Sequence, residues 1–220
     1  MSNETDWDEL SDEYTEHTPA IIGETIRPQR AITMDDIDDI FAGRPLADQP
    51  LTVSFVGDQA MTRDPRSSGD QFIGDGTLTL GNHHYHFLRL HFHDHSEHLF
   101  DGQRQDAEVH FVYQDDQGQT LVLAMLGEEA AVNEPGLDFT PVINGQAGAV
   151  YLNQFFANNQ GYFNYTGSLT TPPLSPDVTW VVLDAVHPFS SDSLALIDDL
   201  FADNYRAPQP ITVPVYHYCN

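Results

Sequence analysis

The residues of this sequence that are best suited to chemistry are three histidines whose spacing fits a metal site: His91, His93 and His110. Successive residues of a strand point to opposite faces, so His91 and His93 are expected to project from the same face. A turn near residues 101–103 would return the chain as a neighbouring strand over residues 107–113, with His110 on that face too. Three imidazole nitrogens with a fourth position open are typical of a catalytic zinc site rather than a closed structural one.

A single histidine on an apolar strand is more often an ordinary structural residue than a metal ligand, and the chain has 11 histidines. The context favours metal binding here, because Glu108 precedes His110 by two residues and is expected on the same face. From there its carboxylate would accept the imidazole N–H and fix the orientation of the ring. The spacing therefore indicates Zn²⁺ as the cofactor.

The composition limits the possible partners. Against 34 acidic residues there are 8 basic ones, all of them arginine, and the formal net charge is -26. Nucleic acid and anionic membranes are therefore not expected as partners. Such acidity can reflect adaptation to high salt, where repulsion between like charges is screened, or another habitat.

The 220 residues are expected to form a single domain over residues 19–220, preceded by an acidic and mobile tail over residues 1–18. The first residues resemble no signal peptide and no apolar run reaches the length of a membrane span, which favours the cytoplasm. A signal removed earlier would instead allow a periplasmic or secreted protein. Cys219 is the sole cysteine, so no disulfide within the chain is expected.

The hydrophobic pattern predicts a mostly antiparallel sheet with a few short helices. Residues 63–70 are expected to be a loop, and further apolar runs at residues 139–142 and 150–156 precede an Asn-rich turn. Helices are predicted over residues 35–43 and 191–201, the second capped by Ser191 or Asp192. Strands are predicted over residues 51–55, 76–80, 85–93, 107–113, 120–126 and 179–183.

A second informative stretch is residues 164–173, Asn-Tyr-Thr-Gly-Ser-Leu-Thr-Thr-Pro-Pro. Taken alone it is an ordinary turn composition. Together with the histidine motifs and with residues 204–210, Asn-Tyr-Arg-Ala-Pro-Gln-Pro, it strongly resembles the alpha-class carbonic anhydrases. The resemblance runs from about Gln29 to Pro210. It implies a mostly β fold in which a large, twisted, mainly antiparallel central sheet carries a few short surface helices.

The resemblance also implies a function, the reversible hydration of carbon dioxide to bicarbonate and a proton. The three histidines match the family's zinc ligands. Thr170 matches the threonine that accepts a hydrogen bond from zinc-bound hydroxide, and Glu97 matches the glutamate that receives the threonine's own proton. Sulfonamides and small anions are the inhibitors that the family implies, and a homodimer is possible.

The resemblance further implies an apolar pocket for carbon dioxide, with Thr171 as polar lining. It also implies a cis peptide bond between Pro172 and Pro173. The pocket residues that match the family are Val112, Met125, Leu169, Val178 and Trp180.

Two positions depart from the family's pattern. Arg89 stands where the family commonly has a glutamine whose carbonyl holds the first zinc histidine, and arginine has no acceptor to offer. His91 must then find another acceptor, or Arg89 turns away toward an acidic group or a bound anion. Asp58 matches the family's proton-shuttle position, but a carboxyl group is a poor shuttle near neutral pH. The proton is expected to leave through water to buffer, or through a rim histidine such as His83, His84, His86 or His95.

Two other functions remain open. A non-catalytic member of the same fold would bind rather than convert a ligand, although such members typically lack one or more zinc histidines. A cupin-like metalloenzyme would use Glu97 as a further metal ligand, because His91, His93 and Glu97 fit part of that motif. Residues 167–173 have no role in a cupin, so this alternative ranks last.

Overall fold

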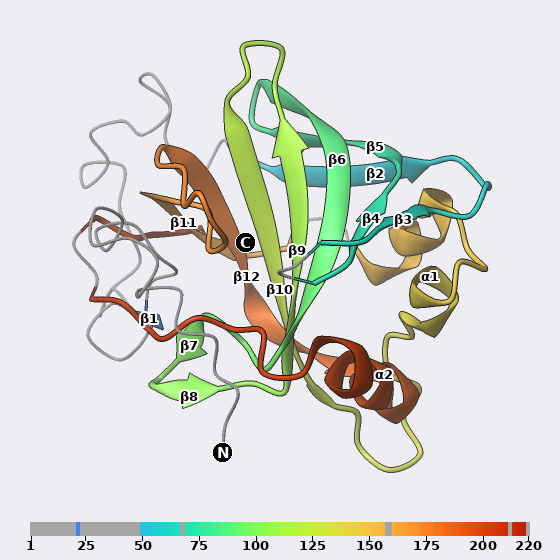
Figure 1. Ribbon diagram of the computed structural model, residues 1–220. Coiled ribbons are helices and arrows are strands. Elements are labelled where there is room, and N and C mark those ends of the chain that lie inside the picture. Colours follow the sequence, from blue (N-terminus) through green and yellow to red (C-terminus); the bar gives the residue numbers. More distant parts are fainter. Residues whose placement is uncertain (1–20, 23–48, 67–68, 157–159, 211–212, 219–220) are drawn as a thin grey trace.

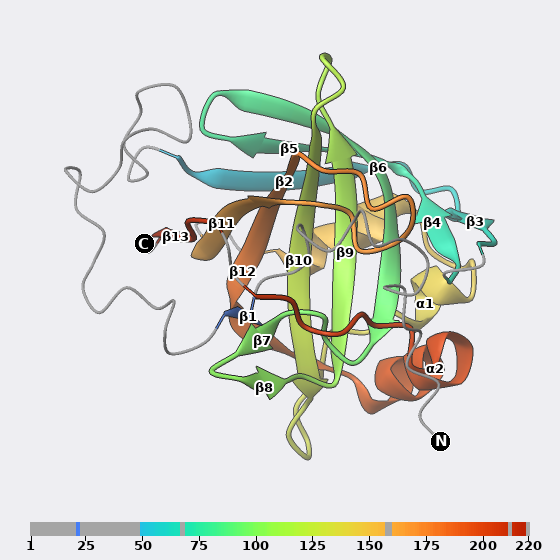
Figure 2. The same cartoon turned by 60° about the vertical axis from the view of Figure 1, so that its left-hand side comes forward.

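The computed structural model describes residues 21–22, 49–66, 69–156, 160–210 and 213–218 (Figure 1). The predicted tail over residues 1–18 and the predicted helix over residues 35–43 lie outside this part of the chain. The rest is built around one large curved sheet, which Figures 1 and 2 show from two sides. The predicted mostly β fold with a twisted, mainly antiparallel sheet is confirmed.

The large sheet has ten strands, and its main path runs in the order β13, β11, β12, β10, β9, β6, β4 and β3. Strand β5 pairs with β6 and with β2. Only the pair of β10 and β12 is parallel among the described neighbours in this sheet. The strands are β2 (Leu51–Val56), β3 (Thr62–Asp64), β4 (Gln71–Ile73), β5 (Asp75–Leu80), β6 (His83–Asp94), β9 (Ala107–Gln114), β10 (Thr120–Glu129), β11 (Tyr162–Gly167), β12 (Val178–Phe189) and β13 (Tyr216–Tyr218).

A small sheet lies beside the large one, with the strand order β1, β7 and β8. Its strands are β1 (Ile21–Ile22), β7 (Leu99–Phe100) and β8 (Gln103–Arg104). Strands β7 and β8 form the turn that carries the chain from β6 back to β9. The predicted return near residues 101–103 is therefore a short hairpin.

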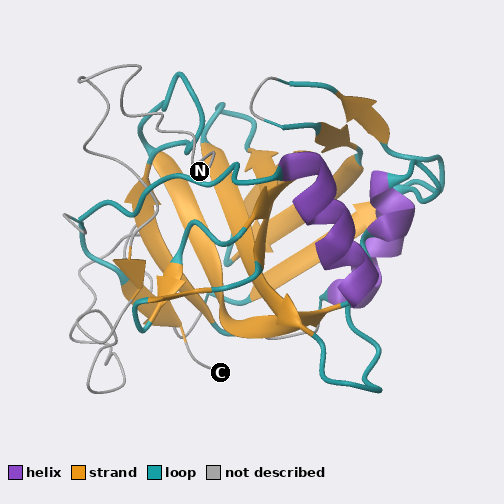
Figure 3. Cartoon of the chain, turned by 60° about the horizontal axis from the view of Figure 1, so that its bottom comes forward, coloured by secondary structure: helices purple, strands orange, loops and turns teal. Residues whose placement is uncertain are grey.

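The helices gather on one side of the sheet (Figure 3). They are α1 (Thr140–Ile143), the 3₁₀ helix η4 (Ala149–Phe155) and α2 (Ser191–Phe201). From β6, Phe92 meets the ring of Phe139 at 5.4 Å and that of Phe201 at 5.7 Å between centroids. Phe92 therefore points toward the helices, and its neighbours along β6, His91 and His93, point to the opposite face of the sheet.

Helix α2 occupies the predicted residues 191–201. Its N-cap is Ser190, whose side chain accepts a hydrogen bond from the backbone N–H of Ser193 at 3.2 Å, so the predicted cap is off by one or two residues. The predicted loop over residues 63–70 shares its first two residues with β3, and its described residues 65–66 and 69–70 are loop as expected, before β4 begins. The apolar runs at residues 139–142 and 150–156 largely coincide with α1 and η4.

Within the described residues, no helix has the length and apolar character needed to cross a membrane.

Candidate metal centre

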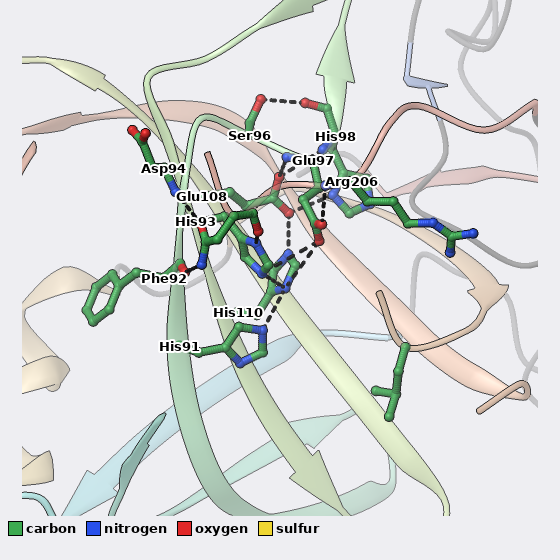
Figure 4. A network of polar contacts seen from close by, with 12 residues as sticks. His91, Phe92, His93, Asp94, Ser96, Glu97, His98, Glu108, His110 and Arg206 are labelled. Carbon is green, nitrogen blue, oxygen red and sulfur yellow. Dashed lines mark hydrogen bonds and ion pairs between the residues drawn. The ribbon is translucent and has the colours of Figure 1, made fainter. Parts of the chain in front are cut away.

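Three histidine side chains converge on the face of the sheet opposite the helices (Figure 4). His91 lies directly across from His110 in the antiparallel pairing of β6 and β9, and His93 lies one side-chain repeat further along β6. The Nδ1 atom of His110 is 3.1 Å from Nε2 of His93 and 3.2 Å from Nε2 of His91. The structure therefore brings the three predicted ligands together.

Outer hydrogen bonds decide which ring nitrogen carries the proton. Nδ1 of His93 lies 2.8 Å from the backbone carbonyl of Asn204, which can only accept, so Nδ1 is the protonated atom. Nε2 of His110 lies 2.6 Å from a carboxylate oxygen of Glu108, so Nε2–H donates there. The inward nitrogens of both rings are then left with lone pairs.

Two lone pairs at 3.1 Å repel each other unless a cation lies between them. A proton could serve one pair of nitrogens, but a metal ion satisfies all three at once. A tetrahedral zinc ion with Zn–N bonds of about 2.0–2.1 Å places its nitrogen ligands about 3.3–3.4 Å apart, close to the separations observed. The residues present therefore fit a zinc ion.

Glu108 is fully buried and serves as the hub of this arrangement. Its carboxylate accepts from His110, from Nδ1–H of His98 at 2.6 Å, and from the backbone N–H groups of Glu97 and His98, both at 2.9 Å. Burial alone would raise the pKa of Glu108, but His98 and His110 together hold it well below its ordinary value. The carboxylate is therefore ionised, as its expected role in orienting His110 requires.

Sequence reasoning assigned no role to His98, Tyr165 or Asn204. Nε2 of His98 lies 2.8 Å from the hydroxyl of Tyr165, so hydrogen bonds connect His110, Glu108, His98 and Tyr165 in sequence. Asn204 holds His93 by its carbonyl and also clamps β6, with its side chain bonded to the backbone of Phe92 and Asp94. The signal was present in both motifs, since His98 adjoins Glu97 and Asn204 opens the stretch 204–210.

The apolar wall beside the histidines differs from its prediction at one residue. Val112, Val178 and Trp180 pack together on the metal side, with Leu169 against them, as expected. Met125 does not, because it lies in the core cluster on the opposite, helix-covered face. The residue that takes this place is Val122, which pairs with Val112 on one side and Trp180 on the other.

These observations agree with comparisons to known proteins. The sequence profile of the family "Eukaryotic-type carbonic anhydrase" matches residues 140–215. A carbonic anhydrase of Nostoc sp. is 32% identical over 143 residues, which make up 61% of this chain and 54% of that protein. The alpha-carbonic anhydrase of Photobacterium profundum superposes with a TM-score of 0.72 at 21% identity, covering 95% of each chain. That of Thermovibrio ammonificans, solved with the inhibitor sulfanilamide, gives 0.71 at 22% identity, covering 96% and 92%.

In sequence and in fold, the chain is thus similar to the alpha-class carbonic anhydrases. It spans a little over half the length of the curated relatives that it matches first, 54% and 59%. The cis peptide bond that the family resemblance implies is present between Pro172 and Pro173.

The family's Thr170 and Glu97 are both buried, but they form no hydrogen bond with each other in the structure. Glu97 Oε1 accepts from the backbone N–H of Arg206 at 2.9 Å. Glu97 Oε2 is buried without a partner among the described residues, 3.6 Å from Nε2 of His93 and 3.9 Å from Nδ1 of His110. An acceptor is thus free to receive the proton of a hydroxyl group.

The departure from the family pattern at Arg89 affects the hydrogen bonding of His91, which matches the family's first zinc ligand. Nδ1 of His91 is buried with no hydrogen-bond partner in the described part of the chain, as is Nε of Arg89. His93 and His110 each have an outer acceptor, whereas Nδ1 of His91 has none among the described residues. Of the two expected outcomes, another acceptor for His91 is thus not found there, and Nε of Arg89 is not bonded to an acidic group there.

The predicted proton-shuttle position is exposed and lies beyond the end of β2 at Asp58. A cavity of about 580 Å³ lies on the metal side of the sheet, with Leu169 and Thr171 in its wall. None of the ten described residues that line it is a histidine, and Asp58 is not among them.

The histidines expected at the rim also lie away from the metal centre. His83, His84 and His86 lie at the far end of β6, five or more residues from His91, which is roughly 16 Å along a strand. His95 is exposed beyond the other end of β6.

The pKa values of His91 and His93 predict how the metal-free protein responds to acid. Burial lowers the pKa of both below the ordinary value of 6.5, and the neighbouring histidines and Arg89 lower that of His91 further. Below pH 6.5 the unfolded chain therefore binds protons that the folded chain excludes, so the free energy of unfolding falls as the pH drops from 6.5 toward 5. Each group contributes up to about 1.4 kcal/mol per pH unit.

Urea unfolding of the zinc-free protein between pH 7.5 and 5 measures this slope. His91→Gln is expected to make the slope shallower. His84→Gln removes an exposed histidine from the same strand and is expected to leave it unchanged. Equal slopes in the native chain and His91→Gln would contradict the prediction.

The unpartnered nitrogen of His91 predicts that Arg89→Gln tightens zinc binding. A glutamine supplies the missing carbonyl acceptor, and such outer partners typically change metal affinity by about 10- to 100-fold. Arg89→Met is the matched control, because it removes the same charge without adding an acceptor. Competition against a chromophoric chelator is expected to rank zinc affinity as Gln, then Met, then the native arginine. Equal affinities for Gln and Met would show that the acceptor is irrelevant.

Proposed function

We propose that this protein is a zinc enzyme that catalyses the reversible hydration of carbon dioxide to bicarbonate and a proton. The observation that carries the proposal is the pair of outer hydrogen bonds, from His93 to Asn204 and from His110 to Glu108, which turn the inward nitrogens of these rings into acceptors for a cation. Zinc held there supplies the nucleophile, since it lowers the pKa of a bound water toward neutrality.

The chain's own residues would each do a separate part of the work. Neutral histidines bind a cation without cancelling its charge, and the lowered pKa values of His91 and His93 keep them neutral. The apolar wall of Val112, Val122 and Trp180 suits carbon dioxide, which has no net charge and no donor group. Trp180 lies beside one of the ligands, with its ring centroid 4.9 Å from that of His110.

Glu97 and Thr170 would orient the nucleophile. A threonine hydroxyl accepts a hydrogen bond in a fixed direction only when its own proton is donated elsewhere. The free Oε2 atom of Glu97 is the buried acceptor suited to take that proton. The product proton would pass through water to buffer, because no histidine is among the described residues that line the cavity.

A stopped-flow carbon dioxide hydration assay on the zinc-loaded protein tests the function. The native protein and His84→Gln are expected to catalyse hydration, and a sulfonamide is expected to abolish it, as the sulfanilamide complex of the Thermovibrio ammonificans enzyme suggests. His110→Ala is expected to lose bound zinc and to fall to the uncatalysed rate. Zinc bound by the native protein without hydration would instead indicate the non-catalytic alternative.

The role of Glu97 is tested by Glu97→Gln, which also decides between this function and a cupin-like site. If Glu97 receives the proton of Thr170, the variant keeps its zinc and loses roughly 10- to 100-fold in kcat/KM, the size of one hydrogen bond to a charged group. Thr170→Val is expected to lose a similar factor, and the double variant little more, because the two residues act as one unit. Loss of zinc from Glu97→Gln would make Glu97 a metal ligand.

A further inference from the structure

Arg89 is a cation without a hydrogen-bonded partner in the described part of the chain. It lines the cavity beside the metal centre, and its Nε atom is buried and unpartnered. Leaving such a group unsatisfied is costly, since guanidinium offers five donors in a rigid fork. An unpaired arginine in a cavity wall therefore favours the binding of a ligand that accepts hydrogen bonds.

The other charged residues of the cavity wall do not neutralise Arg89. Arg66 donates to Asp64 from Nε at 3.0 Å and from a terminal nitrogen at 2.6 Å, so these two side chains are paired with each other. Asp64, Arg66 and Arg89 are the charged groups among the ten lining residues, which leaves one positive charge in excess. The whole protein carries a formal charge of -26, so this positive spot contrasts with the rest of the molecule.

Arg89 also lies close to the metal centre. It precedes His91 by two residues on β6, and its charge contributes to the lowered pKa of His91. Leu169 and Thr171, the neighbours of Thr170 in sequence, line the same cavity. An anion on Arg89 would therefore lie near the residues proposed to act on the substrate.

We propose that Arg89 forms a binding site for a planar, singly charged oxyanion, and that this anion is bicarbonate, the product of the reaction proposed above. A guanidinium group presents two parallel N–H donors that match two oxygens of such an anion. Carbon dioxide offers no such charge, so the site would hold bicarbonate alone. The identity of the anion rests on the proposed function, whereas the site itself does not.

Nitrate is the probe for the site, because it is planar, singly charged and inert in this reaction. The chain has eight basic residues, all arginine, so a ¹H–¹⁵N spectrum of the arginine Nε–H groups holds few signals, and Arg89→Gln assigns the one from Arg89. Titration at constant ionic strength, with chloride as the balancing ion, is expected to shift the Arg89 signal and the backbone N–H signal of Thr171 saturably. The titration is made on the zinc-loaded and the zinc-free protein, so that nitrate on zinc is recognised.

The variants decide whether Arg89 is responsible. In Arg89→Gln the shift of the Thr171 signal is expected to need at least about tenfold more nitrate. Arg63→Gln is the matched control, because it removes one positive charge from the nearby strand β3 at a residue that does not line the cavity and pairs with Asp70. A linear response of Arg89, or an equal loss in Arg63→Gln, would overturn the site.

The dehydration reaction tests bicarbonate as the occupant. In the zinc-loaded protein, Arg89→Gln is expected to raise KM for bicarbonate about tenfold, whereas kcat/KM for dehydration and for hydration must change by the same factor because the overall equilibrium is fixed. An unchanged KM beside a nitrate effect would overturn bicarbonate as the ligand. If no hydration occurs at all, the proposed function fails, while the nitrate titration still decides the anion site.

Discussion

The ionised carboxylate of Glu108 is the constraint on which the rest of the site depends. A carboxylate buried this completely would normally be neutral. It stays charged because four donors point at it, two from histidine rings and two from the backbone where β6 has ended. These donors fix the proton of His110 on its outer nitrogen. Without that charge the inner nitrogen of His110 would be as suited to donate as to accept.

The rest of the sheet holds this geometry in place from both sides. On the helix side, Phe92 packs between Phe139, the N-cap residue of α1, and Phe201 of α2. On the metal side, the ring centroids of His98 and Trp180 are 5.1 Å apart. Asn204, just beyond α2, fastens the end of β6 by its backbone and its side chain. The ligands thus stand on paired strands rather than on loops, and ligand groups on rigid elements are the more precisely placed.

Local sequence patterns could predict which residues share a face, but not which distant residues complete the site. The alternation of β6 and β9 correctly placed the three histidines and Glu108 on one side. The same rule puts Val122 and Met125 on opposite faces of β10, but only the register against β9 shows that Val122 is the one beside Val112. The bond from His93 to Asn204 joins residues 111 apart in the chain, and no local pattern reaches that far.

The arginine at position 89 connects two features that otherwise look separate. Because arginine has no acceptor, His91 lacks, within the described residues, the outer hydrogen bond that His93 and His110 possess. Because arginine is charged and Asp64 is already engaged by Arg66, the cavity wall has an excess positive charge. A cation near the metal site opposes a divalent ion and attracts an anion. Arg89 therefore weakens the binding of the metal and strengthens the binding of an anion. When Arg89 is replaced, the affinity for zinc should rise and the affinity for the anion should fall.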